Sequence, residues 1–175
     1  MSTRVPFMRN RLQSSLSPLF GAAIVMLMTA TLLWGSSPPR NQSKSLLLAL
    51  SHARTGEVLF TQAVHAKDVI RLSWIHSVEL TPWEEYYHIL STGELLLVTT
   101  RFQSYGAGVP EYGGTFRKER DWMIYEDINK VLPALQWIHS RSAKFQVQLN
   151  NNILLRTEDM PHHEPLKLSI RGEIR

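Results

Sequence analysis

The chain has 175 residues, no cysteine and a formal net charge of +4. Without cysteine, disulfides, thiolate catalysis and cysteine-ligated zinc are excluded. The charge is unevenly placed: residues 1–34 contain Arg4, Arg9 and Arg11 and no acidic residue, which leaves 16 Lys and Arg against 15 Asp and Glu in the remainder. A nearly neutral remainder argues against nucleic-acid binding, which needs Lys and Arg clustered on one face of a domain.

Residues 18–34 read PLFGAAIVMLMTATLLW and carry no charge. At 1.5 Å per residue this segment spans roughly 26 Å as a helix, at the short end for a membrane span. Because the three arginines precede it, the positive-inside bias places residues 1–17 in the cytoplasm and everything after Trp34 outside. We therefore expect a single-pass anchor in the inner (cytoplasmic) membrane of a bacterium.

A signal peptide is the alternative interpretation of the same segment. Gly35 and Ser37 supply a small-x-small cleavage site, although Pro38 follows it directly. Under both interpretations the rest of the chain is exported. Residues 35–44, GSSPPRNQSK, are typical of a polar extended linker, and residues 45–175 have the size of one extracytoplasmic domain.

Apolar residues after the linker recur with a period of two, which is typical of half-buried strands. The predicted strands are residues 46–50, 58–60, 70–78, 84–90, 95–102, 145–149, 153–155 and 166–170. A turn signal at residues 91–93 joins two of them into a hairpin. Helix is conceivable only at residues 126–139, where Pro133 limits it to two short pieces. The predicted fold is all-β: a small antiparallel sandwich or barrel preceded by one N-terminal transmembrane helix.

The stretch at residues 76–85, HSVELTPWEE, is the first candidate site. Strand alternation places His76 on the same face as Trp74 and Val78, the expected core face. Glu79 and the glutamates at positions 84 and 85 follow the strand end, where a hairpin can fold them back. Two interpretations stay open: a His–Glu pair that lines a ligand pocket, or a core histidine hydrogen-bonded to the backbone.

The stretch at residues 100–110, TRFQSYGAGVP, is the second candidate site. Its glycines permit positive φ and close approach of a partner, and its arginine and serine are suited to binding a carboxylate or phosphate. The structural interpretation is a tight turn that closes the sheet. We expect the candidate ligand- or partner-binding residues to converge at one sheet edge: His76, Glu79, Arg101, Ser104, Gly106 and Gly108.

No complete catalytic or metal set can be assembled from the sequence. The HExxH and GxSxG signatures are absent, and His76 and Ser77 are neighbours that point to opposite faces of a strand. His162 and His163 are adjacent in a loop, and two adjacent histidines without a third ligand are typical of solvated side chains. We therefore expect no catalytic residue, no metal and no cofactor, and we predict that the protein is not an enzyme.

Taken together, residues 76–85 and the segment FQSYGAGVP at residues 102–110 resemble the bacterial family called domain of unknown function 1850, over roughly residues 46–170. The resemblance implies a small protein with an N-terminal hydrophobic segment, often encoded beside permeases of TAXI-type TRAP transporters. These transporters take up solutes with an ion gradient and an extracytoplasmic binding protein. The family supplies no catalytic or binding residue.

The leading functional hypothesis is a non-catalytic accessory protein at the outer face of the inner membrane, in contact with a TRAP permease or its solute-binding protein. The first alternative is a small-molecule-binding module with a pocket lined by His76, Glu79, Arg101, Ser104 and the backbone of residues 106–108. The second is an exported hydrolase that uses His76 and a glutamate as base.

Overall fold

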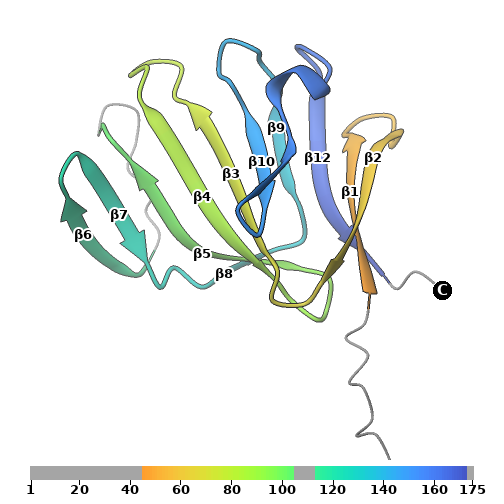
Figure 1. The fold of residues 1–175 in the computed structure, drawn as a ribbon, viewed down its shortest axis with the longest axis horizontal. Helices are drawn as coiled ribbons and strands as arrows, with labels where there is room; N and C mark the ends of the chain where they lie inside the picture. The colour runs from red at the N-terminus through yellow and green to blue at the C-terminus, as the bar shows by residue number, and fades with distance from the viewer. Residues whose placement is uncertain (1–44, 105–112, 173–175) are drawn as a thin grey trace, which may run out of the picture. The chain divides into compact units, whose positions relative to one another are not determined.

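The computed structural model describes residues 45–104 and 113–172, which fall in one unit, Arg40–Arg175. These residues form two antiparallel sheets, with a single 3₁₀ turn, η1 (Thr157–Asp159), as the one helical element among them (Figure 1). The predicted cytoplasmic tail, anchor and linker lie outside the described residues. Within residues 45–104 and 113–172, no helix has the length and apolar character needed to cross a bilayer.

The smaller sheet has the strand order β2-β1-β12-β9. Its strands are β1 (Ser45–His52), β2 (Val58–His65), β9 (Leu135–Ile138) and β12 (Pro165–Arg171). The first and last described strands are thus central neighbours, with Leu47 opposite Arg171 in antiparallel register.

The larger sheet has the strand order β11-β10-β3-β4-β5-β7-β6, and β8 also pairs with β5. Its strands are β3 (Val69–Ile75), β4 (Pro82–Ile89), β5 (Leu95–Phe102), β6 (Thr115–Glu119), β7 (Trp122–Glu126), β8 (Lys130–Leu132), β10 (Gln146–Leu149) and β11 (Asn152–Leu155). Strands β3, β4 and β5 form an antiparallel meander, which includes the predicted hairpin between β4 and β5.

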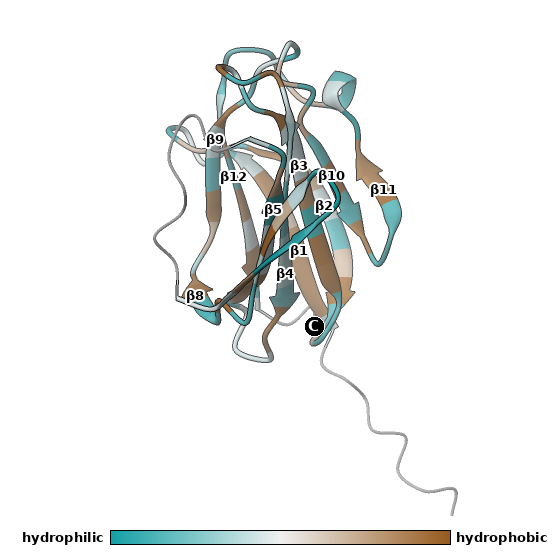
Figure 2. Ribbon diagram, turned by 90° about the vertical axis from the view of Figure 1, so that its left-hand side faces the viewer, coloured by the Kyte–Doolittle hydropathy of each residue, from teal (hydrophilic) through white to brown (hydrophobic). Residues whose placement is uncertain are grey.

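The core is built by alternate residues of both sheets. Leu48 of β1 and Leu168 of β12 come from the smaller sheet, and Ile70 of β3 and Leu97 of β5 come from the larger one. All four are at most 1% exposed, so each contributes about 1.5–3 kcal/mol by leaving water. Figure 2 shows the hydrophobic segments mainly along the strands. One core shared by two sheets makes the fold a sandwich.

The all-β prediction is confirmed, and a strand occurs at each of the eight predicted places. The strand predicted at residues 70–78 is too long, because β3 ends at Ile75 and Val78 is 70% exposed. His76 therefore does not share a core-facing strand with Val78. The turn after Ile75 happens to place His76 and Val78 in the same alternation as the strand. For this reason the periodicity predicted a longer strand than the one that forms.

The possible helix at residues 126–139 is wrong. Two short strands occupy this segment: β8 pairs with β5 of the larger sheet, and β9 pairs with β12 of the smaller sheet. Pro133 and Ala134 separate them. A proline cannot donate a hydrogen bond to a ladder, so Pro133 ends one pairing and the chain changes sheets within two residues.

Candidate functional site

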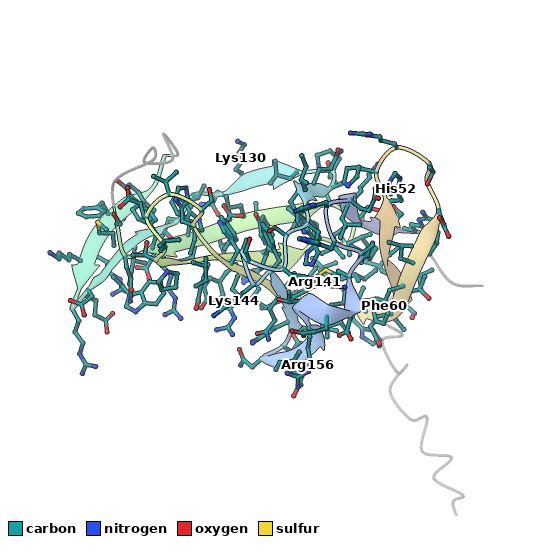
Figure 3. The ribbon with its side chains drawn as sticks, turned by 90° about the horizontal axis from the view of Figure 1, so that it is seen from above. His52, Phe60, Lys130, Arg141, Lys144 and Arg156 are labelled. Atoms are coloured by element: carbon teal, nitrogen blue, oxygen red, sulfur yellow. The ribbon has the colours of Figure 1, made fainter. Side chains whose placement is uncertain are left out.

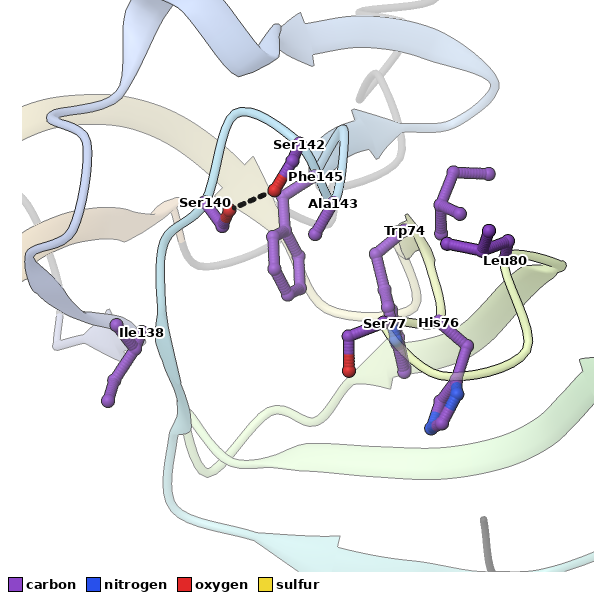
Figure 4. Close-up of a pocket in the computed structure, with 10 residues that line it drawn as sticks. Trp74, His76, Ser77, Leu80, Ile138, Ser140, Ser142, Ala143 and Phe145 are labelled. Atoms are coloured by element: carbon purple, nitrogen blue, oxygen red, sulfur yellow. Dashed lines mark hydrogen bonds between the residues drawn. The ribbon is translucent and has the colours of Figure 1, made fainter. Parts of the chain in front are cut away.

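A cavity of about 370 Å³ opens at the end of the sandwich where β3 meets its loop to β4 and where β9 leads toward β10 (Figure 4). We call this end the pocket pole; it lies at the top of Figure 1. The lining residues are Trp74, Ile75, His76, Ser77, Leu80, Ile138, Ser140, Ser142, Ala143 and Phe145. None of them is an acid, a lysine or an arginine.

The first wall of the cavity is the loop between β3 and β4. The His76 N–H donates to the Thr81 carbonyl and the Leu80 N–H donates to the His76 carbonyl, both at 2.9 Å. These two bonds close the loop on itself. Leu80 has a φ of 54°, a left-handed conformation in which a bulky side chain is uncommon, and it is 75% exposed.

The second wall is the turn between β9 and β10. The Lys144 N–H donates to the Arg141 carbonyl at 3.1 Å, and the Ile75 N–H donates to the Ala143 carbonyl at 2.7 Å, which ties the turn to the end of β3. The hydroxyls of Ser140 and Ser142 lie 2.8 Å apart, within hydrogen-bond distance. Figure 3 looks down on this pole and shows Arg141 and Lys144 near the middle of the view.

Aromatic rings form the floor between the two walls. Trp74 and Phe145 are stacked with centroids 5.7 Å apart, and Trp137 lies behind Phe145 at 5.9 Å. Trp74 is also stacked on Trp83 of β4, because these two residues are direct antiparallel partners. The His76 ring lies 5.8 Å from the Trp83 ring. The floor is thus fixed by packing that continues into the larger sheet.

Three of the predicted site residues lie together beside the cavity. The Glu79 N–H donates to His76 Nδ1 at 3.5 Å, a long bond, and the Ser104 hydroxyl donates to Glu79 Oε2 at 2.6 Å. His76 alone of the three lines the cavity. Gly106 and Gly108 lie outside the described residues, so their predicted place in the cluster stays a prediction.

Arg101 lies elsewhere, on the outer face of the larger sheet. Its neighbour Phe102 is in the core, and alternation turns Arg101 the opposite way. Its Nε and Nη2 bond Glu84 Oε2 at 2.8 and 2.7 Å, and its guanidinium lies 4.6 Å from the Trp122 ring. The Tyr86 hydroxyl donates to the same Glu84 oxygen at 2.6 Å. Arg101 therefore stabilises the sheet surface and is not among the lining residues of the cavity.

Glu85 faces the inside of the sandwich, on the same side of β4 as Trp83. Burial raises the pKa of its carboxyl above the usual 4.5, and the Tyr87 hydroxyl, which donates to Oε2, opposes this rise together with Trp83 and Lys130. Neither Glu85 nor Glu84 hydrogen-bonds His76 among the described residues. Of the two open interpretations, the His–glutamate pair is not formed with these two residues; His76 Nδ1 instead accepts a bond from the Glu79 backbone N–H.

Half of the residues that line the cavity come from a segment that the sequence analysis did not connect with the site. The lining residues that no motif marks run from the end of β9 into the turn before β10, about 60 residues after His76, and include Ile138, Ser140, Ser142 and Phe145. The described residues contain no group of three acids or histidines placed to hold a metal ion. The rings of His162 and His163 are tilted by 31° with centroids 3.6 Å apart, and the Arg141 N–H donates to His162 Nδ1 at 3.2 Å.

The sequence model of the family described as Domain of unknown function (DUF1850) matches residues 70–155, from β3 to β11. Residues 70–155 belong to this family. The match includes both walls of the cavity and both stretches that carried the resemblance. No curated protein and no solved structure matches the chain.

Proposed function

We propose that the DUF1850 chain is a non-catalytic, extracytoplasmic accessory protein of a TAXI-type TRAP solute transporter, and that it binds its partner through the pocket pole. The assignment to a TRAP transporter is inferred from the family resemblance. The binding surface is argued from the exposed residues at this pole. The partner is a TRAP permease or its solute-binding protein.

Leu80 is the observation that carries the proposed binding surface. Its side chain is 75% exposed, so its apolar area stays in water. Its backbone has a φ of 54°, which glycine or asparagine adopts at lower cost. Both features disfavour leucine at this position in the free chain. A partner that covers the side chain offsets both, because burying a leucine contributes about 1.5–3 kcal/mol.

Two further apolar side chains accompany Leu80 at the pocket pole. Val78 is 70% exposed in the same loop, and Ile138 is 67% exposed at the end of β9, where it lines the same cavity. The other large apolar residues that are exposed in the described ranges reach at most 47%. Apolar residues gathered beside a cavity are typical of a protein-binding surface.

The test is co-purification of the tagged full-length chain from its own bacterial host in mild detergent, with mass spectrometry of the captured proteins. We expect a TRAP permease or a TRAP solute-binding protein. Leu80→Asn should reduce the captured amount at least about tenfold, because one apolar anchor of about 1.4 kcal/mol or more is lost. Its melting temperature should stay unchanged or rise, since asparagine tolerates positive φ.

Ile153→Asn is the matched control, because Ile153 is 43% exposed on β11 but does not line the cavity. It should capture as much partner as the unmodified chain. Capture without any TRAP component would refute the transporter role. Equal capture by the Leu80 and Ile153 variants would refute the pocket pole as the binding surface.

A small-molecule-binding module is the second candidate function, and the cavity itself favours it. Its volume of about 370 Å³ lies within the range of ligand sites, and its lining combines aromatic rings with a few polar groups. Of the residues first assigned to such a pocket, His76 lines it, whereas Glu79 and Arg101 do not. A direct binding measurement on the isolated chain decides this candidate.

A further inference from the structure

Three histidines lie where the second wall of the cavity meets the segment between β11 and β12. His139 follows β9 and is 0% exposed, whereas His162 and His163 are exposed in the loop before β12. Backbone bonds join the two segments: the His139 N–H donates to the Glu164 carbonyl at 2.9 Å, and the His163 N–H donates to the His139 carbonyl at 2.8 Å. We call His139, His162 and the turn at residues 140–144 the histidine clasp.

The buried ring of His139 is built into the clasp in its neutral form. Its Nε2 lies 3.1 Å from the Thr157 carbonyl oxygen, which accepts hydrogen bonds and does not donate them, so Nε2 carries the ring hydrogen. Nδ1 is buried and has no hydrogen-bond partner among the described residues. A proton on Nδ1 would therefore bring a donor without an acceptor, and a charge without a counter-charge, into the interior.

The ring of His162 fixes the turn through a lone pair. The Arg141 N–H donates to His162 Nδ1 at 3.2 Å, so this bond exists only while Nδ1 carries no proton. A proton on Nδ1 would also place a positive charge beside the His163 ring, whose centroid is 3.6 Å away, and close to the start of a basic turn. Protonation of His162 thus removes one of the bonds that hold the turn.

No counter-charge awaits either ring when it is protonated. The titratable and charged side chains on the segments that meet at the clasp, and across the cavity from it, are those of His52, His76, Arg141, Lys144, Arg156, Glu158, Asp159, His163 and Glu164. Within the described ranges none of the three acids forms an ion pair with His139 or His162. Glu164 instead bonds His52 Nε2 at 3.0 Å, and Asp159 accepts from the Arg156 N–H at 2.8 Å.

Both rings resist protonation in the closed clasp. Burial lowers the pKa of His139 below its usual 6.5, the bond to the Thr157 carbonyl opposes this, and His162 and Arg141 lower the pKa further. Desolvation, His163 and Arg141 likewise lower the pKa of His162. Because the closed clasp binds these protons less tightly than an open one, its stabilisation is present above pH 6.5 and is lost as the pH falls through the closed-state pKa values.

We propose that the histidine clasp is a pH-sensitive switch, which holds the second wall of the cavity in place while both rings are neutral and releases it when they are protonated. The released turn contributes Ser140, Ser142 and Ala143 to the cavity lining. Acid outside the membrane would therefore weaken partner binding at the pocket pole. This consequence rests on the proposed function, whereas the release of the turn needs no partner.

The test is hydrogen–deuterium exchange of the full-length chain in mild detergent, measured by mass spectrometry at about pH 7.5 and about pH 5.5, on either side of histidine titration. Exchange is corrected for its intrinsic pH dependence. Peptides that cover residues 138–146 report on the clasp, because the amides of His139, Arg141 and Lys144 donate hydrogen bonds in its closed form. Their protection should fall about tenfold at the lower pH, the effect of one orphaned buried group. Peptides that cover residues 46–50, in the core strand β1, should keep theirs.

Two variants keep the hydrogen bonds of the clasp and remove its titration. His139→Gln retains a donor for the Thr157 carbonyl, and His162→Asn retains an acceptor for the Arg141 N–H. Each should reduce the loss of protection at low pH, and the double variant should abolish it. His88→Gln is the matched control, because His88 is exposed on the outer face of the larger sheet; it should respond to pH as the unmodified chain does.

The proposal is overturned if the protection of residues 138–146 is the same at both pH values, or if residues 46–50 lose protection equally, which would mean that the whole domain opens. It is also overturned if His162→Asn responds to pH as the His88 variant does. His162 is exposed, so its variant tests the clasp even where His139→Gln does not fold. No partner takes part in this measurement, and its failure is therefore distinct from failure of the co-purification.

Discussion

Glu85 is an acid on the inner face of β4, where burial raises the pKa of its carboxyl above 4.5. Its folded-state pKa is higher than its unfolded-state pKa, so the folded chain holds the proton more tightly. The stabilisation is fully present below pH 4.5 and is lost as the pH rises through the folded-state pKa. Ionised Glu85 therefore opposes folding at neutral pH.

Glu85→Gln should raise the free energy of unfolding at neutral pH and remove this part of its pH dependence. The amide oxygen still accepts the hydrogen bond from the Tyr87 hydroxyl, while the buried charge is gone. Denaturant unfolding measured at several values between pH 4 and pH 8 tests this. A variant whose stability falls with rising pH as steeply as that of the unmodified chain would contradict the assignment.

His76→Ala should cost little stability, about 0.5–1.5 kcal/mol by denaturant unfolding. The imidazole is only partly buried and accepts one long bond from the Glu79 N–H, while the loop is closed by backbone bonds that alanine keeps. A loss above about 3 kcal/mol would mean that His76 is chiefly a core residue. That outcome would favour the structural interpretation of this histidine over the binding one.

The sequence predicted part of this site because strand ends alternate in a meander. The loop after β3 and the end of β5 lie at the same edge of the sheet, which brings Glu79 within 2.6 Å of Ser104. The same alternation, applied residue by residue, turns Arg101 away, because Phe102 occupies the inner face. The Ser140–Ser142 wall needs contacts between distant segments, which periodicity does not encode.

Among the strands, aromatic residues form a continuous row across the inner face of the larger sheet. Phe102 of β5 stacks on Trp83 of β4 at 4.4 Å and on Tyr125 of β7 at 6.1 Å, and Phe116 of β6 lies 5.0 Å from Tyr125. The antiparallel register that pairs Trp74 with Trp83 and Trp83 with Phe102 produces this row. It connects the cavity floor to the far edge of the sheet.

Phe102→Ala should lower the free energy of unfolding by about 3–5 kcal/mol, because Phe102 is 1% exposed and has rings on both sides. Phe116→Ala, at the end of the row and 45% exposed, should cost less than about half as much. Denaturant unfolding of both variants measures the difference. Equal losses would mean that the row does not stabilise the sheet as a stack.

Strands were predicted correctly where a turn signal and an alternating pattern occur together, and were missed elsewhere. Asn150 and Asn151 both have positive φ and form the two-residue turn between β10 and β11. In contrast, the four strands between residues 115 and 138 were not predicted: β6, β7, β8 and β9. All five residues of β6 are exposed, so it has no alternating pattern. The assignment of β8 and β9 to different sheets depends on partners elsewhere in the chain.

At the scale of the whole chain, export is the prediction that governs where the pocket pole can act. A periplasm-active reporter fused after Arg175 should be active, because the arginines before residue 18 favour a cytoplasmic N-terminus. Reporter activity is measured in whole cells against a fusion that lacks residues 1–34. A full-length fusion as inactive as the fusion that lacks residues 1–34 would refute an extracytoplasmic function.

The order of the central strands also determines how the sandwich responds to mechanical load. Residues 45 and 171 are at the same end of the neighbouring antiparallel strands β1 and β12, opposite the pocket pole (Figure 1). A pull applied between the two chain ends would peel β1 from β12 one hydrogen-bonded pair at a time. A pull between residue 45 and a partner held at the pocket pole would instead run along the strands, over about 26 Å of β1. That load is shared by many ladder bonds at once, so the domain should resist force far better in the direction in which a tethered binding domain is loaded.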